Sequence, residues 1–416
     1  MASYSHPLNG RKLHIPRMSI EGAEVLAAVF RSVGVQALVS PESDENTLKL
    51  AARFTTGEEC LPERITLGNF LKIILDRHFE PARHAFFLPT SSGPCRFGQY
   101  SPFLEKILRE LDYADAMVIA PTSSDGYASV AQNKYRFLWP AWRAVIVSDA
   151  LRKLLLMFRP YESRRGEADR LMQESLSEVV GILERNDLSL GRQRALLTGA
   201  MEASRDRFMH LTLAEEKGTR PLVGVVGEIF LRFNEFSNQY LLRRIEAAGG
   251  ETWIAGVAEW IYYTNTEERR KLRDRNRQWH PSMHFARLRY SLQHREEMHI
   301  IAPLAPLFGE RPDARVEEIL RYSRPYLPAD KALGEMTLNS GNTIAFRHAG
   351  CDGVVDISPF TCMNGIVTEA VYPVISRDFG DFPVRVFYFD GVPLDLDNDL
   401  EIFMEMVHSY RKRKNI

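Results

Sequence analysis

The first 120 residues alternate between two patterns of apolar and polar positions. Short apolar runs are typical of buried strands, and apolar residues spaced three or four apart are typical of helices. Strands are predicted at 13–18, 35–40, 84–89 and 114–121. Helices are predicted at 20–33, 45–54, 65–76 and 101–111. Strands that alternate with helices indicate βαβ units and a parallel sheet.

The middle of the chain has a different pattern. Residues 127–218 carry aromatic and basic side chains at helical spacing, with no strand-like run. The alternation of strands and helices returns at 221–230 and continues to a terminal helix, interrupted by a charged helical stretch at 265–325. We therefore predict an N-terminal α/β domain (1–126), a helical linker subdomain (127–220) and a C-terminal α/β domain (221–416).

Composition and charge indicate which classes of protein this chain does not resemble. The chain has 416 residues, and its 53 basic and 54 acidic residues leave a net charge of −1, which does not favour a nucleic-acid binder. The N-terminus lacks the apolar core of a signal peptide, and no apolar run approaches the ~20 residues of a membrane span. Four cysteines in a chain of this length argue against a disulfide framework. We expect a cytoplasmic protein without a membrane span.

Three of the four cysteines share one setting. Cys60, Cys95 and Cys362 each come directly before a predicted helix and beside glycine or proline. In parallel sheets the carboxyl ends of the strands form the edge where ligands bind. Helix N-termini favour anions and lower the pKa of a thiol, and small residues let backbone N–H groups approach a ligand. Three thiolates in this setting describe a pocket for an anionic iron–sulfur cluster.

Other interpretations of the cysteines stay open. The spacings of 35 and 267 residues match no CxxC-type signature, so three buried structural thiols are an alternative. A zinc site is a second alternative, although zinc normally takes four nitrogen or sulfur ligands. Cys351 lies at the opposite end of a predicted strand from Cys362, roughly 20 Å away at 3.3 Å per residue. We expect Cys351 to be a buried apolar side chain outside the site.

Four segments carry a family resemblance. They are GEECLPERITLGNFLK (57–72), FFLPTSSGPCRFGQY (86–100), GEIFLRFNEFSNQYLLRRIEAAGGETWIAGVAEWIYY (227–263) and DGVVDISPFTCMNG (352–365). In this order they resemble the C-terminal part of the long CoA-substrate-specific enzyme activases, relatives of the 2-hydroxyacyl-CoA dehydratases and benzoyl-CoA reductases. The resemblance runs over most of 11–125 and 221–405.

The resemblance implies a fold, a cofactor and a partner. It implies two Rossmann-like α/β domains with an oxygen-sensitive [4Fe–4S] cluster in the cleft between them, held by Cys60, Cys95 and Cys362. It also implies an ATP-hydrolysing activase of actin-like fold that delivers low-potential electrons. The substrate would be an acyl-CoA or another small molecule, and the protein would be the oxidoreductase or lyase component of a dehydratase-like or reductase-like system. Pairing with a second copy or a related subunit is also expected.

The chain departs from the long activases in two respects. It has no phosphate-binding loop, so we expect ATP hydrolysis to belong to another chain. Three cysteines leave the fourth iron open, or joined to a second cluster in a double cubane. Two other functions stay open: an electron relay without its own substrate, and a non-enzymatic scaffold or assembly protein.

Residues beside the cysteines are further candidates. Glu59 and Arg96 flank the first two cysteines, where charged groups would tune a cluster's potential and supply protons, so we take them as candidate catalytic residues. Gly93 and Pro94 would let the backbone approach a cofactor, and Asn238 would line the cleft. Ordinary salt bridges and helix-start charges are the alternative for the charged residues.

Overall fold

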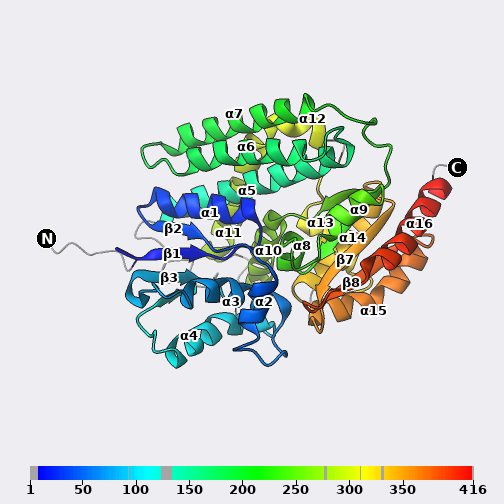
Figure 1. Ribbon diagram of the computed structural model, residues 1–416. Coiled ribbons are helices and arrows are strands. Elements are labelled where there is room, and N and C mark those ends of the chain that lie inside the picture. Colours follow the sequence, from blue (N-terminus) through cyan, green and yellow to red (C-terminus); the bar gives the residue numbers. More distant parts are fainter. Residues whose placement is uncertain are drawn as a thin grey trace.

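The computed structural model contains two four-stranded sheets surrounded by helices (Figure 1). It describes residues 8–91, 93–122, 134–275, 279–309, 311–328 and 332–414. Every strand pair in both sheets is parallel. The predicted α/β class with two parallel-sheet units is therefore confirmed.

The first sheet is built by residues 12–119 in the order β2-β1-β3-β4. Its strands are β1 (Lys12–Ile15), β2 (Gln36–Val39), β3 (His84–Phe87) and β4 (Met117–Ile119). Its helices are α1 (Ile20–Ser32), α2 (Glu45–Ala51), α3 (Leu61–Ile74) and α4 (Tyr100–Glu110), with short 3₁₀ turns η1 (Pro81–Arg83) and η2 (Arg96–Gln99).

The second sheet repeats this strand order. Its order is β6-β5-β7-β8, with β5 (Leu222–Gly227), β6 (Glu251–Ile254), β7 (Gly353–Pro359) and β8 (Val384–Phe389). The helices around it are α8 (Ile229–Phe233), α9 (Leu241–Ala247), α14 (Glu335–His348), α15 (Met363–Asp378) and α16 (Leu396–Lys414). In each sheet the chain adds the second strand on one side of the first strand and the third on the other side. That reversal is the switch point where open α/β sheets bind ligands.

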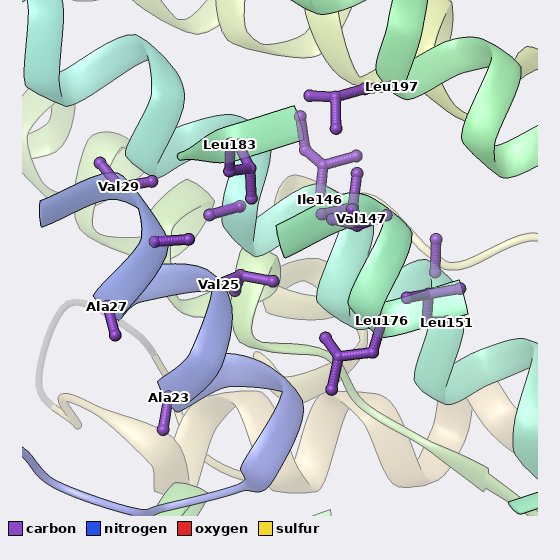
Figure 2. Close-up of a cluster of buried hydrophobic side chains, with 14 of the residues drawn as sticks. Ala23, Val25, Ala27, Val29, Ile146, Val147, Leu151, Leu176, Leu183 and Leu197 are labelled. Carbon is purple, nitrogen blue, oxygen red and sulfur yellow. The ribbon is translucent and has the colours of Figure 1, made fainter. Parts of the chain in front are cut away.

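The middle helices pack on the first sheet. They are α5 (Lys134–Phe158), η3 (Arg159–Tyr161), α6 (Glu167–Leu183) and α7 (Leu190–Met209). Figure 2 shows Val25 and Val29 of α1 beside Val147 of α5 and Leu183 of α6, all within one buried apolar cluster. The helical region therefore shares a core with α1 and does not stand apart from the first sheet.

The charged stretch between β6 and β7 forms a further helical layer. It contains α10 (Val257–Asp274), α11 (Pro281–Ile300), η4 (Ala302–Leu304), α12 (Ala305–Phe308) and α13 (Val316–Ser323). Figure 1 places α10 and α13 near the second sheet and α11 behind the first. Within the described part of the chain, no helix has the length and apolar character needed to cross a membrane.

Local sequence explains where the key helices begin. The side chain of Ser19 accepts a hydrogen bond from the Gly22 N–H at the start of α1, and Asp44 and Thr47 form a capping box on α2. Helix α3 begins at Leu61, four residues earlier than predicted, because Pro62 fits the first helical turn. This earlier start places Cys60 at the helix boundary.

Candidate functional site

Three cysteines occupy the residue before a helix. Cys60 precedes α3, Cys95 precedes η2, which leads into α4, and Cys362 precedes α15. Cys95 follows β3 and Cys362 follows β7, which are the third strands of two sheets with the same strand order. Cys95 and Cys362 therefore lie at equivalent positions beside the two switch points.

The side chain of Arg96 joins the three cysteine segments. Its Nη1 donates to the backbone oxygen of Glu58 (2.6 Å), two residues before Cys60. Its Nη2 donates to the backbone oxygen (3.0 Å) and Oγ1 (2.8 Å) of Thr361, directly before Cys362. Since Arg96 itself follows Cys95, one guanidinium gathers all three segments in one place.

The backbone at Thr361 is strained. Its φ is +65°, in the left-handed region that a β-branched residue rarely adopts. Such strain persists only where surrounding contacts hold it, and it concentrates at functional sites. The two hydrogen bonds from Arg96 are contacts of this kind, so the Cys362 turn depends on a residue of the first sheet's domain.

Further hydrogen bonds join the two sheet units near the cysteines. Arg64 of α3 donates from Nη1 to the backbone oxygen of Asp390, just after β8 (2.8 Å). Asn234, which ends α8, donates from Nδ2 to the backbone oxygen of Arg17, just after β1 (3.0 Å). The three cysteines therefore lie at the junction of the two units.

Burial keeps the three thiols protonated in the absence of a positive partner. It raises the pKa of Cys60 to about 11 and that of Cys362 to about 12. Neighbouring atoms also partly desolvate the Cys95 sulfur and raise its pKa, although the residue as a whole is exposed. Backbone N–H groups oppose the shift at each thiol, because they stabilise the thiolate. They belong to Glu63 at Cys60, Phe97 at Cys95, and Gly365 and Asn364 at Cys362.

Tyr100 forms a direct contact with the first cysteine. Its hydroxyl lies 2.7 Å from Cys60 Sγ, and the Tyr100 residue is 8% exposed. Burial and the neighbouring thiol hold the pKa of Tyr100 well above its ordinary value, so the hydroxyl keeps its proton. Glu63 lines a small cavity together with Tyr100, and burial raises the pKa of Glu63 to about 7.

Two carboxyl groups raise the pKa values of the cysteine thiols when they are ionised. Glu228 follows β5 and acts electrostatically on all three thiols, and Glu335 acts on Cys95 and Cys362. Glu335 Oε1 accepts from the Ile229 N–H (2.8 Å), and Glu228 Oε2 accepts from the Leu231 N–H (2.9 Å).

The two carboxyl groups favour a protonated state. Burial raises the pKa of Glu335 to about 8 and also raises the pKa of Glu228. The nearby Arg232 guanidinium is buried and opposes both shifts, but one positive charge does not keep two buried carboxylates ionised. The pair is therefore a place where a proton is held near the cysteines.

Some buried polar atoms near the site are left without a partner. Among the described side chains, these include Arg232 Nε, Asn339 Nδ2 and Asn364 Oδ1. Arg232 and Asn339 are 4% and 2% exposed, and Asn364 comes two residues after Cys362. Buried polar atoms of this kind normally find a partner, so they favour a polar ligand in this region.

The other residues proposed from the sequence lie as follows. The Glu59 carboxylate accepts hydrogen bonds from the N–H groups of Thr56 and Gly57, at 3.0 Å in each case. These bonds stabilise the turn at 56–59. Gly93 and Pro94 are exposed beside Cys95, and the φ of Gly93 is +149°. Asn238 is buried, and its amide bonds to the backbone of Leu231 and Leu241, which links α8 to α9.

Cys351 lies apart from the other cysteines. It is fully buried in an apolar cluster with Trp253, Phe346 and Phe382. It precedes β7, whereas Cys362 follows that strand. Its thiol therefore belongs to the core, as the sequence indicated.

The side chains of the site can be tested as metal ligands. In the part of the chain that the structure describes, no three His, Cys, Asp or Glu side chains converge on a site for a single metal ion. Cys60, Cys95 and Cys362 supply three sulfur donors from three segments, each with backbone N–H groups that favour its thiolate.

Sequence reasoning missed four residues of the site: Tyr100, Glu228, Glu335 and Thr361. Glu228 was accessible from the sequence, because it lies near the carboxyl end of the stretch 221–230, and β5 ends directly before it at Gly227. Tyr100 and Thr361 could not be assigned, because their roles depend on contacts across 40 and 265 residues of chain.

Comparisons with known proteins found no match: no family model and no curated protein matches this chain.

Proposed function

We propose that this protein is a [4Fe–4S] protein whose cluster is held by Cys60, Cys95 and Cys362. The observation that carries the proposal is the Arg96 side chain, which brings the three cysteine segments together from both sheet units. The three thiols stand at the starts of three helical segments, where backbone N–H groups favour the anionic thiolate form.

The chain's own residues have distinct tasks in this proposal. The three thiols would bind the cluster as thiolates, a form that nearby positive charge would favour against the burial that otherwise raises their pKa values. The N–H groups of Glu63, Phe97 and Gly365 then donate to the ligand sulfurs. Glu228 and Glu335 hold a proton beside the site.

When bound, the cluster supplies one-electron transfer at low potential. This chain has no phosphate-binding loop, so the proposal assigns ATP hydrolysis to a partner of actin-like fold that donates the electron. Cys351 lies in another core and would provide no fourth thiolate, so a substrate could take the fourth position of a cluster held by the other three cysteines. Acyl-CoA chemistry for that substrate rests on the resemblance of the four sequence segments.

The test is anaerobic purification or reconstitution followed by iron and sulfide analysis of the wild type and four alanine variants. We expect about four irons per chain in the wild type. Cys60→Ala, Cys95→Ala and Cys362→Ala are expected to lower or abolish iron binding, whereas Cys351→Ala is the matched control and should keep it. EPR spectra after reduction with dithionite should show a signal from the reduced cluster.

The outcomes separate the alternatives. A wild-type protein that binds zinc and no iron would indicate a structural zinc site and contradict the cluster. A chain without metal that still forms a complex with a partner would identify a scaffold. Iron bound equally well by all three alanine variants would place the cluster elsewhere.

A further inference from the structure

The contact between Tyr100 and Cys60 has a direction once the thiol is deprotonated. The hydroxyl oxygen lies 2.7 Å from Cys60 Sγ, and in a thiol either atom could be the donor. A thiolate has no proton to give, so only the Tyr100 hydroxyl can donate in the metal-bound state. A hydrogen bond to a charged acceptor is among the stronger ones.

The position of Tyr100 makes this bond well defined. Tyr100 is the first residue of α4, and its ring packs edge-on against Phe97 with centroids 5.2 Å apart. The same ring belongs to the apolar core formed with α3, the helix that Cys60 precedes. Packing on two sides therefore holds the hydroxyl against the sulfur and keeps bulk water away from the bond.

We propose that Tyr100 is a positioning residue that raises the reduction potential of the cluster through its hydrogen bond to Cys60 Sγ. This inference rests on the proposed cluster function. Reduction by one electron from a low-potential donor adds negative charge to the cluster and its sulfur ligands. A donor to a ligand sulfur stabilises the reduced state more than the oxidised state.

Each of the other two cysteines also meets backbone N–H groups, but only Cys60 has a side-chain hydroxyl donor among the described residues. A backbone N–H is lost only on substitution by proline, which also changes the backbone, whereas Tyr100→Phe removes the hydroxyl alone. A substitution at Tyr100 can therefore change the reduction potential of the cluster without changing one of its cysteine ligands.

The test compares Tyr100→Phe with the wild type and with Tyr113→Phe. Tyr113 packs on Phe79 in the same core and is the matched control for loss of a phenol oxygen. Iron content is measured first, and then the potential by EPR-monitored redox titration. We expect full iron in all three proteins and an about tenfold smaller equilibrium constant for reduction in Tyr100→Phe alone, a shift of about 59 mV to more negative potential.

A second variant reverses the expected sign. Incorporation of 3-fluorotyrosine at position 100 keeps the ring and makes the hydroxyl a stronger donor, so the potential should rise. This variant keeps the proposal testable even where Tyr100→Phe binds no cluster.

The outcomes distinguish the inference from the function on which it rests. Full iron with the same potential in the wild type, Tyr100→Phe and the fluorotyrosine protein would overturn the inference and leave the cluster in place. A wild type that binds no iron under any condition would overturn both. An equal shift in Tyr113→Phe would assign the effect to the core and contradict the role of the hydrogen bond.

Discussion

The guanidinium of Arg96 donates to Thr361 Oγ1 across 2.8 Å, although the two residues are 265 positions apart in the chain. Arg96 follows Cys95 and Thr361 precedes Cys362, so this bond joins the corresponding edges of two sheets with the same strand order. The distance and orientation between Cys95 and Cys362 therefore depend on how the two sheets pack against each other.

Substitution of Arg96 should weaken that junction. Arg96→Gln removes the charged hydrogen bonds to Glu58 and Thr361, and we expect the free energy of unfolding to fall by about 1–2 kcal/mol because the side chain is only partly buried. Urea unfolding measures the change. Arg83→Gln is the control, since Arg83 is 62% exposed and forms an ion pair with the exposed Glu80. An Arg96→Gln protein as stable as the Arg83→Gln protein would contradict the role of Arg96 in the junction.

A close approach between α2 and α3 should make Gly68 intolerant of a side chain. A Cβ at Gly68 would lie 2.1 Å from the backbone oxygen of Thr47, and neither helix backbone can move away cheaply. We expect Gly68→Ala to lower the free energy of unfolding by about 2–3 kcal/mol. Gly181→Ala in α6 meets open space and should raise it by about 0.5–1 kcal/mol. Thermal unfolding of both variants tests the contrast, which would fail if both shifted in the same direction.

A partly buried histidine pair predicts loss of stability in mild acid. His14 Nε2 lies 2.8 Å from His84 Nδ1, and burial followed by the charge of His84 lowers the pKa of His14 to about 4. The unfolded chain binds the His14 proton below pH 6.5, whereas the folded chain binds it only near pH 4. The free energy of unfolding should therefore fall by about 3 kcal/mol between these values, at 1.36 kcal/mol per unit of pKa shift.

The histidine prediction is checked by urea unfolding at pH 7.5, 6.5, 5.5 and 4.5. His14→Gln should flatten the profile in this range, and His408→Gln in α16 is the matched control for loss of an imidazole. Equal slopes in the wild type and His14→Gln would assign the acid sensitivity to other groups.

The fourth cysteine should affect stability without affecting the site. Cys351→Ser places a hydroxyl among Trp253, Phe346 and Phe382, and a buried hydroxyl without a partner costs about 1–3 kcal/mol. We expect iron binding to be kept, because Cys351 lies at the opposite end of β7 from Cys362. Denaturant unfolding and iron analysis of the same preparation separate the two effects. Loss of iron from a folded Cys351→Ser protein would indicate that Cys351 takes part in iron binding.

The local pattern of the sequence predicted many elements of this fold. Alternating apolar and polar runs predicted β1, β2, β3 and β4. Nearby glycine and proline residues indicated that Cys60, Cys95 and Cys362 come before helices. These features could be predicted because strand and helix periods, caps and first-turn prolines depend on neighbours within a few residues. The earlier start of α3 at Leu61 shows the limit of such boundaries, since Pro62 extended the helix by one turn.

The tertiary structure decided what those elements do together. The sequence by itself determined the parallel α/β class and three thiols at helix starts. Only packing showed that both sheets have the same strand order, that α5–α7 share a core with α1, and that Arg96 reaches Thr361 while Tyr100 reaches Cys60. Contacts between segments 40 to 265 residues apart leave no periodic trace in the sequence. They arise only when the apolar faces of separate elements are buried against one another, and that burial sets the geometry of the site.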